Sequence, residues 1–417
     1  MKKHPTEFVK SNRFDVAAKY LYAKYRERGY DTKFAEDVYY QHLKVWNNFN
    51  EIDNENKNTF ENFKETFHNI LDSIKKDGFD STKGTLPITS DEKLLNGSHR
   101  LSASLFYDVP VECHVAETMG EGQLDCSGSY FSSLGLSGFY MDAMSTEYAR
   151  LDTKTLVITF FPSATVNQQG MQTAEQMISE HCDIVSAKTI SWENNAPLNV
   201  ARQLYLGESW GLNWDNNFSG FMRKAELCFT NTAPMVAVLV VPRPHVDPVV
   251  FKNHLRNIFG LGKHSCHIND THEETMRICR VFFNDNSIHH LNKSKNVFWP
   301  SFQSQFDYYK KYIKTNNLDP ENYCITASSV LSLYGLRQGQ DLDYLHRGDE
   351  IYGHPDIHSH NQEIEKYTMS KDEIMFNPQN HFWHDGVKVA SVNVVRSLKQ
   401  KRGEPKDHRD IELMETL

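Results

Sequence analysis

The chain has 417 residues, of which 39% are hydrophobic and 24% charged, and its formal net charge is −9. This is a typical globular composition, and the length allows roughly two to four domains that each bury a core. The acidic balance argues against a general nucleic-acid binder, which would carry an excess of basic residues. The longest apolar run, residues 235–241, is too short to cross a bilayer.

Seven cysteines are scattered singly along the chain, and no pair has CxxC spacing. This pattern is typical of a reduced compartment and argues against a structural zinc site. The first residues lead into polar sequence, without the apolar stretch of a secretory signal. The sequence therefore predicts a cytoplasmic protein that does not contact membranes.

The N-terminal third opens with apolar side chains at helical spacing over residues 10–75, interrupted by a polar turn at 54–58. Residues 86–116 then have the pattern of strand, turn, helix and strand. The segment 118–138 is rich in glycine and serine and is interpreted as a long loop.

Strand and helix patterns alternate through the rest of the chain. Apolar runs predict buried strands at residues 155–161, 183–190 and 234–241, with helices between and after them. From about residue 298 we expect a helix, a strand–helix–strand unit, a loop rich in histidine and a terminal helix. The sequence therefore predicts an α+β multidomain protein with domains at 1–148, 149–297 and 298–417.

The most specific stretch is residues 323–345, YCITASSVLSLYGLRQGQDLDYL. Asp341 and Asp343 are two residues apart on a predicted strand, so both side chains project from one side of it and can bind one or two divalent cations. Phosphoryl chemistry uses such cations to hold triphosphate oxygens. Ser328 and Ser329 form a turn of small residues whose backbone N–H groups can approach phosphates. The alternative is a solvated Asp-x-Asp at a strand edge.

With the serine turn, the Gly-Leu-Arg sequence and the two aspartates in this order, residues 320–415 resemble the polymerase-β-type nucleotidyltransferases. The resemblance implies a nucleotidyltransferase-like α/β domain in which the aspartates bind Mg²⁺ or Mn²⁺ and an NTP is the co-substrate. Arg337 is expected to contact the triphosphate beside the serine turn. The third carboxylate of the family is not placed by the sequence, and its candidates are Glu363, Glu365 and Asp385.

A second constellation lies at residues 255–279, where Arg256 precedes a glycine loop and His267 is followed by small polar residues. A histidine near a helix start is well placed for phosphate chemistry. The alternative is a capping turn in which Asp270 or Thr271 begins the helix.

Residues 150–290 as a whole resemble nucleoside diphosphate kinase. The resemblance implies a ferredoxin-like domain in which His267 is the phosphorylated nucleophile and Arg256, Lys263 and Asn269 hold the phosphates. The family's Lys-Pro-Asp is replaced here by Phe-Pro-Ser at residues 161–163, so its phosphate-binding lysine is absent.

A third constellation is the turn at residues 96–100, Asn-Gly-Ser-His-Arg, which opens a helix. Backbone N–H groups, the helix dipole, His99 and Arg100 can together bind an anion. The alternative is a structural His–Arg pair. Residues 80–117 resemble the ParB/sulfiredoxin superfamily, whose members include nucleases, CTP binders and small-molecule kinases.

These regions together predict NTP-dependent transfer of a phosphoryl or nucleotidyl group to a small-molecule or glycan-precursor acceptor. The alternative is a degenerate nucleotide-binding sensor or regulatory protein without turnover. A nuclease is a more distant alternative. The sequence leaves open whether the protein forms a homo-oligomer. A weaker candidate, a histidine cluster without standard metal spacing, comprises His354, His358 and His360.

Overall fold

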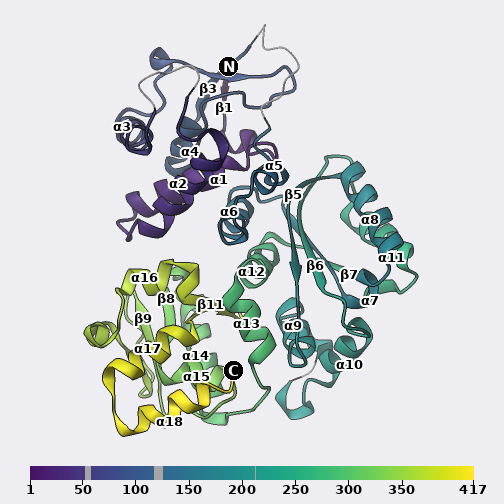
Figure 1. Ribbon diagram of the computed structural model, residues 1–417, viewed down its shortest axis with the longest axis vertical. Coiled ribbons are helices and arrows are strands. Elements are labelled where there is room, and N and C mark those ends of the chain that lie inside the picture. The colour runs from purple at the N-terminus through teal and green to yellow at the C-terminus, as the bar shows by residue number, and fades with distance from the viewer. Residues whose placement is uncertain (52–57, 117–124, 212) are drawn as a thin grey trace.

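The computed structural model of the chain describes residues 1–51, 58–116, 125–211 and 213–417. Helices surround three separate sheets, which confirms the predicted α+β class. Figure 1 shows the N-terminal part in purple to blue, the middle part in teal to green and the C-terminal part in green to yellow, each built around one sheet. The exact domain boundaries stay a prediction.

The N-terminal sheet has the order β1-β3-β2, in which β1 pairs antiparallel and β2 parallel with β3. Its strands are β1 (Lys2–Lys3), β2 (Leu86–Ile88) and β3 (Val111–Val115). The helices of this part are α1 (Asp15–Glu27), α2 (Lys33–Asn47), α3 (Phe60–Asp77), α4 (Ser98–Tyr107), α5 (Gly128–Ser133) and α6 (Gly138–Leu151).

The predicted long loop at 118–138 is wrong where it is described, because α5 forms within it. The Ser127 side chain accepts a hydrogen bond from the Tyr130 backbone N–H, and Phe131 is buried, so a cap and one apolar anchor make the short helix. The part of this loop at 118–124 lies outside the described residues, as does most of the turn predicted at 54–58.

The middle sheet is antiparallel throughout, in the order β5-β6-β4-β7. Its strands are β4 (Leu156–Phe160), β5 (Cys182–Ile190), β6 (Met235–Pro242) and β7 (Cys266–Ile268). The helices are α7 (Pro162–Thr165), α8 (Gln168–His181), α9 (Ala196–Leu204), α10 (Ser219–Cys228), α11 (Pro248–Phe259), α12 (His272–Phe282) and α13 (Asp285–Lys293).

Successive side chains of β4 pack into different cores, because they point to opposite faces of the sheet. Ile158 joins the cluster under α8 and α11, whereas Val157 joins the large cluster that contains residues of α9 and α12. Figure 1 shows these helix pairs on the two sides of the sheet.

The C-terminal sheet is mixed, in the order β10-β9-β8-β12-β11. Its strands are β8 (Tyr323–Thr326), β9 (Leu342–His346), β10 (Ile357–Ser359), β11 (His381–His384) and β12 (Val387–Ala390). The helices are α14 (Pro300–Thr315), α15 (Ser328–Leu333), α16 (Lys371–Phe376), α17 (Val392–Arg402) and α18 (Pro405–Met414).

Two expectations for this part are wrong. The histidine-rich segment is not only loop, because it contributes the edge strands β10 and β11. The single terminal helix is two helices, since Gly403 has a φ of +65° and Pro405 begins the next one.

One continuous hydrophobic cluster runs through all three parts, and α6 and α12 lie where they meet (Figure 1). All seven cysteines are buried and free. Among the described residues, no helix has the length and apolar character needed to cross a bilayer.

Candidate functional site

The backbone at the end of β8 is unusual. Thr326 pairs with Asp343 of β9, and the next residue, Ala327, has φ 53° and ψ −136° before α15 begins at Ser328. A non-glycine residue in this region costs on the order of 1–3 kcal/mol and persists only where the surroundings impose it. The strained alanine, which is buried, therefore sets the direction of the serine turn next to the strand that carries Asp343.

The hydroxyl of Ser329 connects this turn to both aspartates. Its Oγ accepts a hydrogen bond from the Asp343 backbone N–H at 3.0 Å and donates to the Asp341 backbone oxygen at 3.3 Å. Ser329 is fully buried, whereas Ser328 before it is half-buried. The Ser329 hydroxyl thus joins the predicted serine turn to the backbone of both predicted aspartates.

The two carboxylates occupy different environments. Asp341 lies one residue before β9, not on the strand as expected, and is half-buried, whereas Asp343 is only 6% exposed. Burial, and secondly the charge of Asp341, raise the pKa of Asp343 to about 7. The pair therefore carries a charge that the surrounding protein stabilises poorly.

His360 is a site residue whose contact with Asp343 the sequence did not reveal. Its Nε2 lies 3.3 Å from Asp343 Oδ1, and its Nδ1 lies 3.0 Å from the Tyr367 hydroxyl. That hydroxyl lies 3.0 Å from the Thr326 hydroxyl, which closes a polar chain around Asp343. The sequence gives only a weak indication of this contact, because the contact depends on the parallel pairing of β10 with β9.

A divalent cation fits the donor chemistry of the pair. Carboxylate oxygens suit Mg²⁺, which keeps several waters and phosphate oxygens as its other ligands. Within the described residues, no cluster of three or more His, Cys, Asp or Glu side chains suits a metal. Of the three candidate third carboxylates, Glu365 is exposed, Glu363 pairs with Lys366, and Asp385 accepts from Gln203 at 2.7 Å.

Arg337 forms an ion pair rather than facing open solvent. Its Nη2 lies 2.7 Å from Asp410 Oδ2, and Lys399 contacts the same carboxylate at 2.6 Å. Contact with a triphosphate would require Arg337 to leave Asp410. Lys399 and Arg402 of α17 are near enough to the aspartate pair to favour the charged form of Asp343, so they supply positive potential there.

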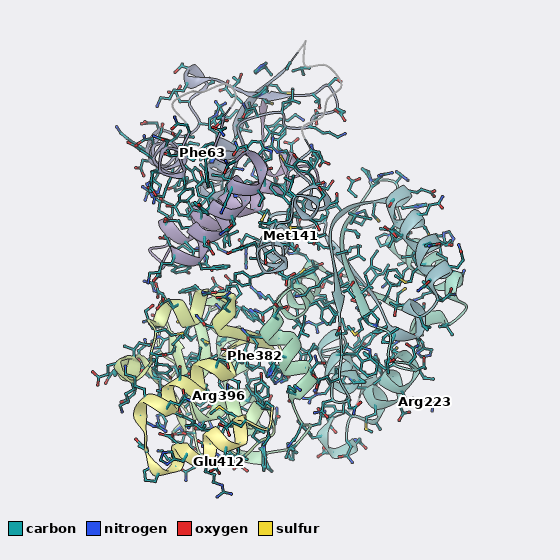
Figure 2. All side chains as sticks on the ribbon, in the orientation of Figure 1. Phe63, Met141, Arg223, Phe382, Arg396 and Glu412 are labelled. Carbon is teal, nitrogen blue, oxygen red and sulfur yellow. The ribbon has the colours of Figure 1, made fainter. Side chains whose placement is uncertain are left out.

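A separate hollow of about 460 Å³ opens in the middle part, with Arg223 toward the outer side of the molecule (Figure 2). Among the described residues its lining holds several basic groups and no carboxylate, a charge pattern that suits an anion. Tyr205 and Trp210 add aromatic walls. The basic groups are Arg223, Lys224, Arg256, Lys263 and His264.

Two of these basic residues, Arg223 and Lys224, were not anticipated as site residues, because the sequence pattern did not single out α10, which carries them. Burial lowers the pKa of Lys224, whose ammonium donates to the Lys263 backbone oxygen. The pocket thus combines the predicted Arg256 and Lys263 with cations from a helix that the sequence left unassigned.

His267 lies in the wall behind this hollow, packed edge-on against Tyr205 with ring centroids 4.9 Å apart. It is on β7 and not at a helix start as predicted, because α12 begins five residues later at His272. Its Nε2 is shielded from solvent and has no hydrogen-bond partner among the described residues. Burial, and secondly Lys252, lower the pKa of His267 to about 3, so the imidazole is neutral near pH 7.

The capping alternative for this segment is confirmed, because Thr271 and Glu274 form a capping box at the start of α12. Asn269 is fully buried between elements: its side chain accepts from the Val157 backbone N–H at 2.7 Å and donates to Thr271 and Thr275. Contact between Asn269 and a phosphate would require these hydrogen bonds to break.

The N-terminal candidates, His99 and Arg100, both form hydrogen bonds with other groups of the protein. His99 Nε2 lies 2.8 Å from the Tyr39 hydroxyl, and Arg100 donates to the backbone oxygens of Gly84 and Thr85. These contacts agree with the structural alternative, and anion binding there stays a prediction. The three candidate regions lie in three different parts of the molecule, so the fold does not join them into one site (Figure 1).

Comparison of the chain with protein-family models, with curated proteins and with solved structures finds no match.

Proposed function

We propose that this protein transfers a nucleotidyl or phosphoryl group from an NTP to a small-molecule or glycan-precursor acceptor, with Asp341 and Asp343 as the metal-binding pair. The observation that carries the proposal is the pair of hydrogen bonds made by the Ser329 hydroxyl, which hold the serine turn against the backbone of both aspartates. This juxtaposition is what metal-assisted phosphoryl chemistry requires, since phosphates and cation must meet at one point.

Each group has a distinct role in this proposal. Asp341 and Asp343 would hold Mg²⁺ or Mn²⁺, and the cation would neutralise negative charge on the triphosphate. Ser328 and Ser329 bring backbone N–H groups toward the phosphates, and the ammonium of Lys399 adds positive potential.

The basic pocket of the middle part supports a second phosphate-bearing ligand. Its strand order, β5-β6-β4-β7, is that of a ferredoxin-like βαββαβ unit, which agrees with the resemblance to nucleoside diphosphate kinase. Arg256 and Lys263 would contact phosphates, while Tyr205 and Trp210 offer rings for stacking. His267 behind Tyr205 is the candidate for phosphoryl relay.

The second candidate function is nucleotide binding without turnover. It is favoured by the ion pair between Arg337 and Asp410, because the arginine that was expected to contact the triphosphate is already bound to a carboxylate. A nucleotide-sensing or regulatory role would need only the binding surfaces and no complete metal site.

One experiment separates these functions. The full-length protein is incubated with Mg²⁺ and each NTP, labelled at the α- or the γ-phosphate, with and without a metabolite extract. Transfer of α-label with release of pyrophosphate supports chemistry at the aspartate pair. Transfer of γ-label supports phosphoryl transfer, and saturable binding without transfer of either label supports the sensor function.

A further inference from the structure

A small cavity of about 70 Å³ lies where the three parts of the molecule meet. Charged side chains from all three parts line it, four of them basic and two acidic. They are Lys24 on α1, Glu147 and Arg150 on α6, Arg280 on α12, Glu321 in the 3-10 turn Pro320–Asn322, and Lys388 on β12. We call this set the junction cluster.

The two carboxylates of the junction cluster are each shared by two cations. Glu147 contacts Lys24 Nζ at 2.6 Å and Arg150 Nε at 3.0 Å. Glu321 contacts Arg150 and, at 3.0 Å, Arg280 Nη2. Lys388 donates to the backbone oxygens of Glu321 and Met375 and has no carboxylate partner among the described residues.

The junction cluster therefore holds two more positive than negative charges. Lys24 is 4% exposed and Lys388 only 3%, whereas the two arginines and Glu321 are half-buried. The nearby Arg28 and Asp319 form an ion pair with each other at 3.5 Å and leave the balance unchanged. Uncompensated buried charge is strongly unfavourable, so a folded protein needs a further anion or the loss of protons to relieve it.

Donor groups remain for such an anion. Arg280 uses one terminal nitrogen on Glu321, while its Nε is shielded from solvent and without a hydrogen-bond partner among the described residues. A cavity site for one water needs about 10–15 Å³ on the same kind of measure. The space is therefore large enough for several waters or for one oxyanion of phosphate size.

We propose that the junction cluster binds a small inorganic oxyanion of the phosphate class, which joins the three parts of the molecule. The site is separate from the aspartate pair and from the basic pocket of the middle part, and it does not depend on the proposed transferase activity. Its role is structural: the anion completes the charge balance of the contact between α1, α6, α12 and β12.

The competing explanation is that the lysines lose their protons instead. Burial lowers the pKa of Lys24 and lowers that of Lys388 to about 8. Deprotonation of both lysines would balance the charge without a ligand. The two explanations differ in one measurable way, because only the first makes the protein bind phosphate at this cavity.

The test is calorimetric titration of the full-length protein with sodium phosphate at pH 7, after dialysis into chloride of equal ionic strength. All titrations use a Lys263→Met background, which weakens phosphate binding in the middle pocket. Lys24→Met removes one junction charge and should weaken the phosphate affinity by about tenfold or more. Glu147→Gln raises the positive excess and should tighten it.

Saturable binding with these opposite responses supports the proposal. Absence of saturable phosphate binding in the Lys263→Met background overturns it, as does an affinity that neither junction variant changes. Glu147→Gln keeps the size of the side chain and one of its two acceptor oxygens, so it is a second variant for the test if Lys24→Met does not fold. An unchanged affinity in Glu147→Gln alone then rejects the junction site.

Discussion

The side-chain oxygen of Ser329 accepts a hydrogen bond of 3.0 Å from the backbone N–H of Asp343. The same hydroxyl donates to the backbone of Asp341, so one buried serine sets the positions of both aspartates relative to α15. A small displacement of either carboxylate would misplace a bound cation, and catalytic groups tolerate little misplacement. The proposed metal site is therefore held by a short, local set of contacts.

Removal of either carboxylate should abolish metal-dependent transfer. We expect Asp343→Asn and Asp341→Asn to reduce turnover by at least about a hundredfold, because the oxygen ligands of the cation lose their charge. Release of labelled pyrophosphate from α-labelled NTP measures the effect. The matched control is Asp356→Asn, an exposed aspartate of the same part, which should retain activity. Full activity in Asp343→Asn would refute the assignment.

The raised pKa of Asp343 predicts a pH-dependent response to Mg²⁺. Its pKa is about 7 in the folded state against ~4 when unfolded, so the folded state binds more protons between these values. Stability without metal therefore falls as pH rises from about 4 to 7. Mg²⁺ needs the deprotonated carboxylate and should raise Tm more at pH 8 than at pH 6.

Asparagine at position 343 is a control for this pH effect, because it cannot ionise. Asp343→Asn removes the charge that burial disfavours, so with EDTA at pH 8 it should be more stable than the natural protein. Thermal unfolding with and without Mg²⁺ checks both statements. Equal Mg²⁺ shifts at the two pH values, or an undiminished shift in Asp343→Asn, would contradict the proposed role of this carboxylate.

The strained backbone before the serine turn predicts an unusual effect of glycine. Ala327→Gly should stabilise the protein by about 1 kcal/mol, because relief of the strain exceeds the entropic cost of glycine. Denaturant unfolding measures the change. Ala390→Gly, at a buried strand position of the same sheet with ordinary φ, should instead destabilise it by a similar amount or more. Destabilisation by both substitutions would mean that Ala327 is not strained.

The sequence predicted the fold best where local patterns decide it. The apolar runs predicted β4, β5 and β6 nearly to the residue. The order of serine turn, helix and aspartates predicted β8, α15 and β9. The edge strands β10 and β11 were missed because strands of three and four residues are too short to show periodicity, and their formation depends on neighbours in the sheet.

Contacts between distant segments could not be predicted in the same way. The approach of His360 to Asp343 depends on the parallel pairing of β10 with β9, and Lys224 reaches the middle pocket from a helix without a recognisable motif. Asn269 shows the converse: a motif residue whose hydrogen bonds are all taken by neighbouring backbone and side-chain groups. Its partners come from β4 and α12, which no single-sequence pattern identifies.

The middle pocket gives the final prediction, on phosphorylation of His267. The imidazole is neutral near pH 7 because burial lowers its pKa to about 3, so a ring nitrogen has a free electron pair for attack on a γ-phosphate. The N–P bond forms as the bond from the γ-phosphorus to the bridging oxygen breaks, and a nucleoside diphosphate leaves. We expect γ-labelled NTP to leave an acid-labile label on the protein.

His267→Gln should remove this label, whereas His264→Gln, in the same pocket, should retain it. Tyr205 packs against the His267 ring, so Tyr205→Ala should change the rate of labelling by altering access to Nε2. Mass-spectrometric localisation after short incubation measures each outcome. Label that persists in His267→Gln would exclude His267 as the nucleophile. Nucleotide binding without label in any variant would assign the middle pocket to binding alone, since its basic groups hold a phosphate without accepting it covalently.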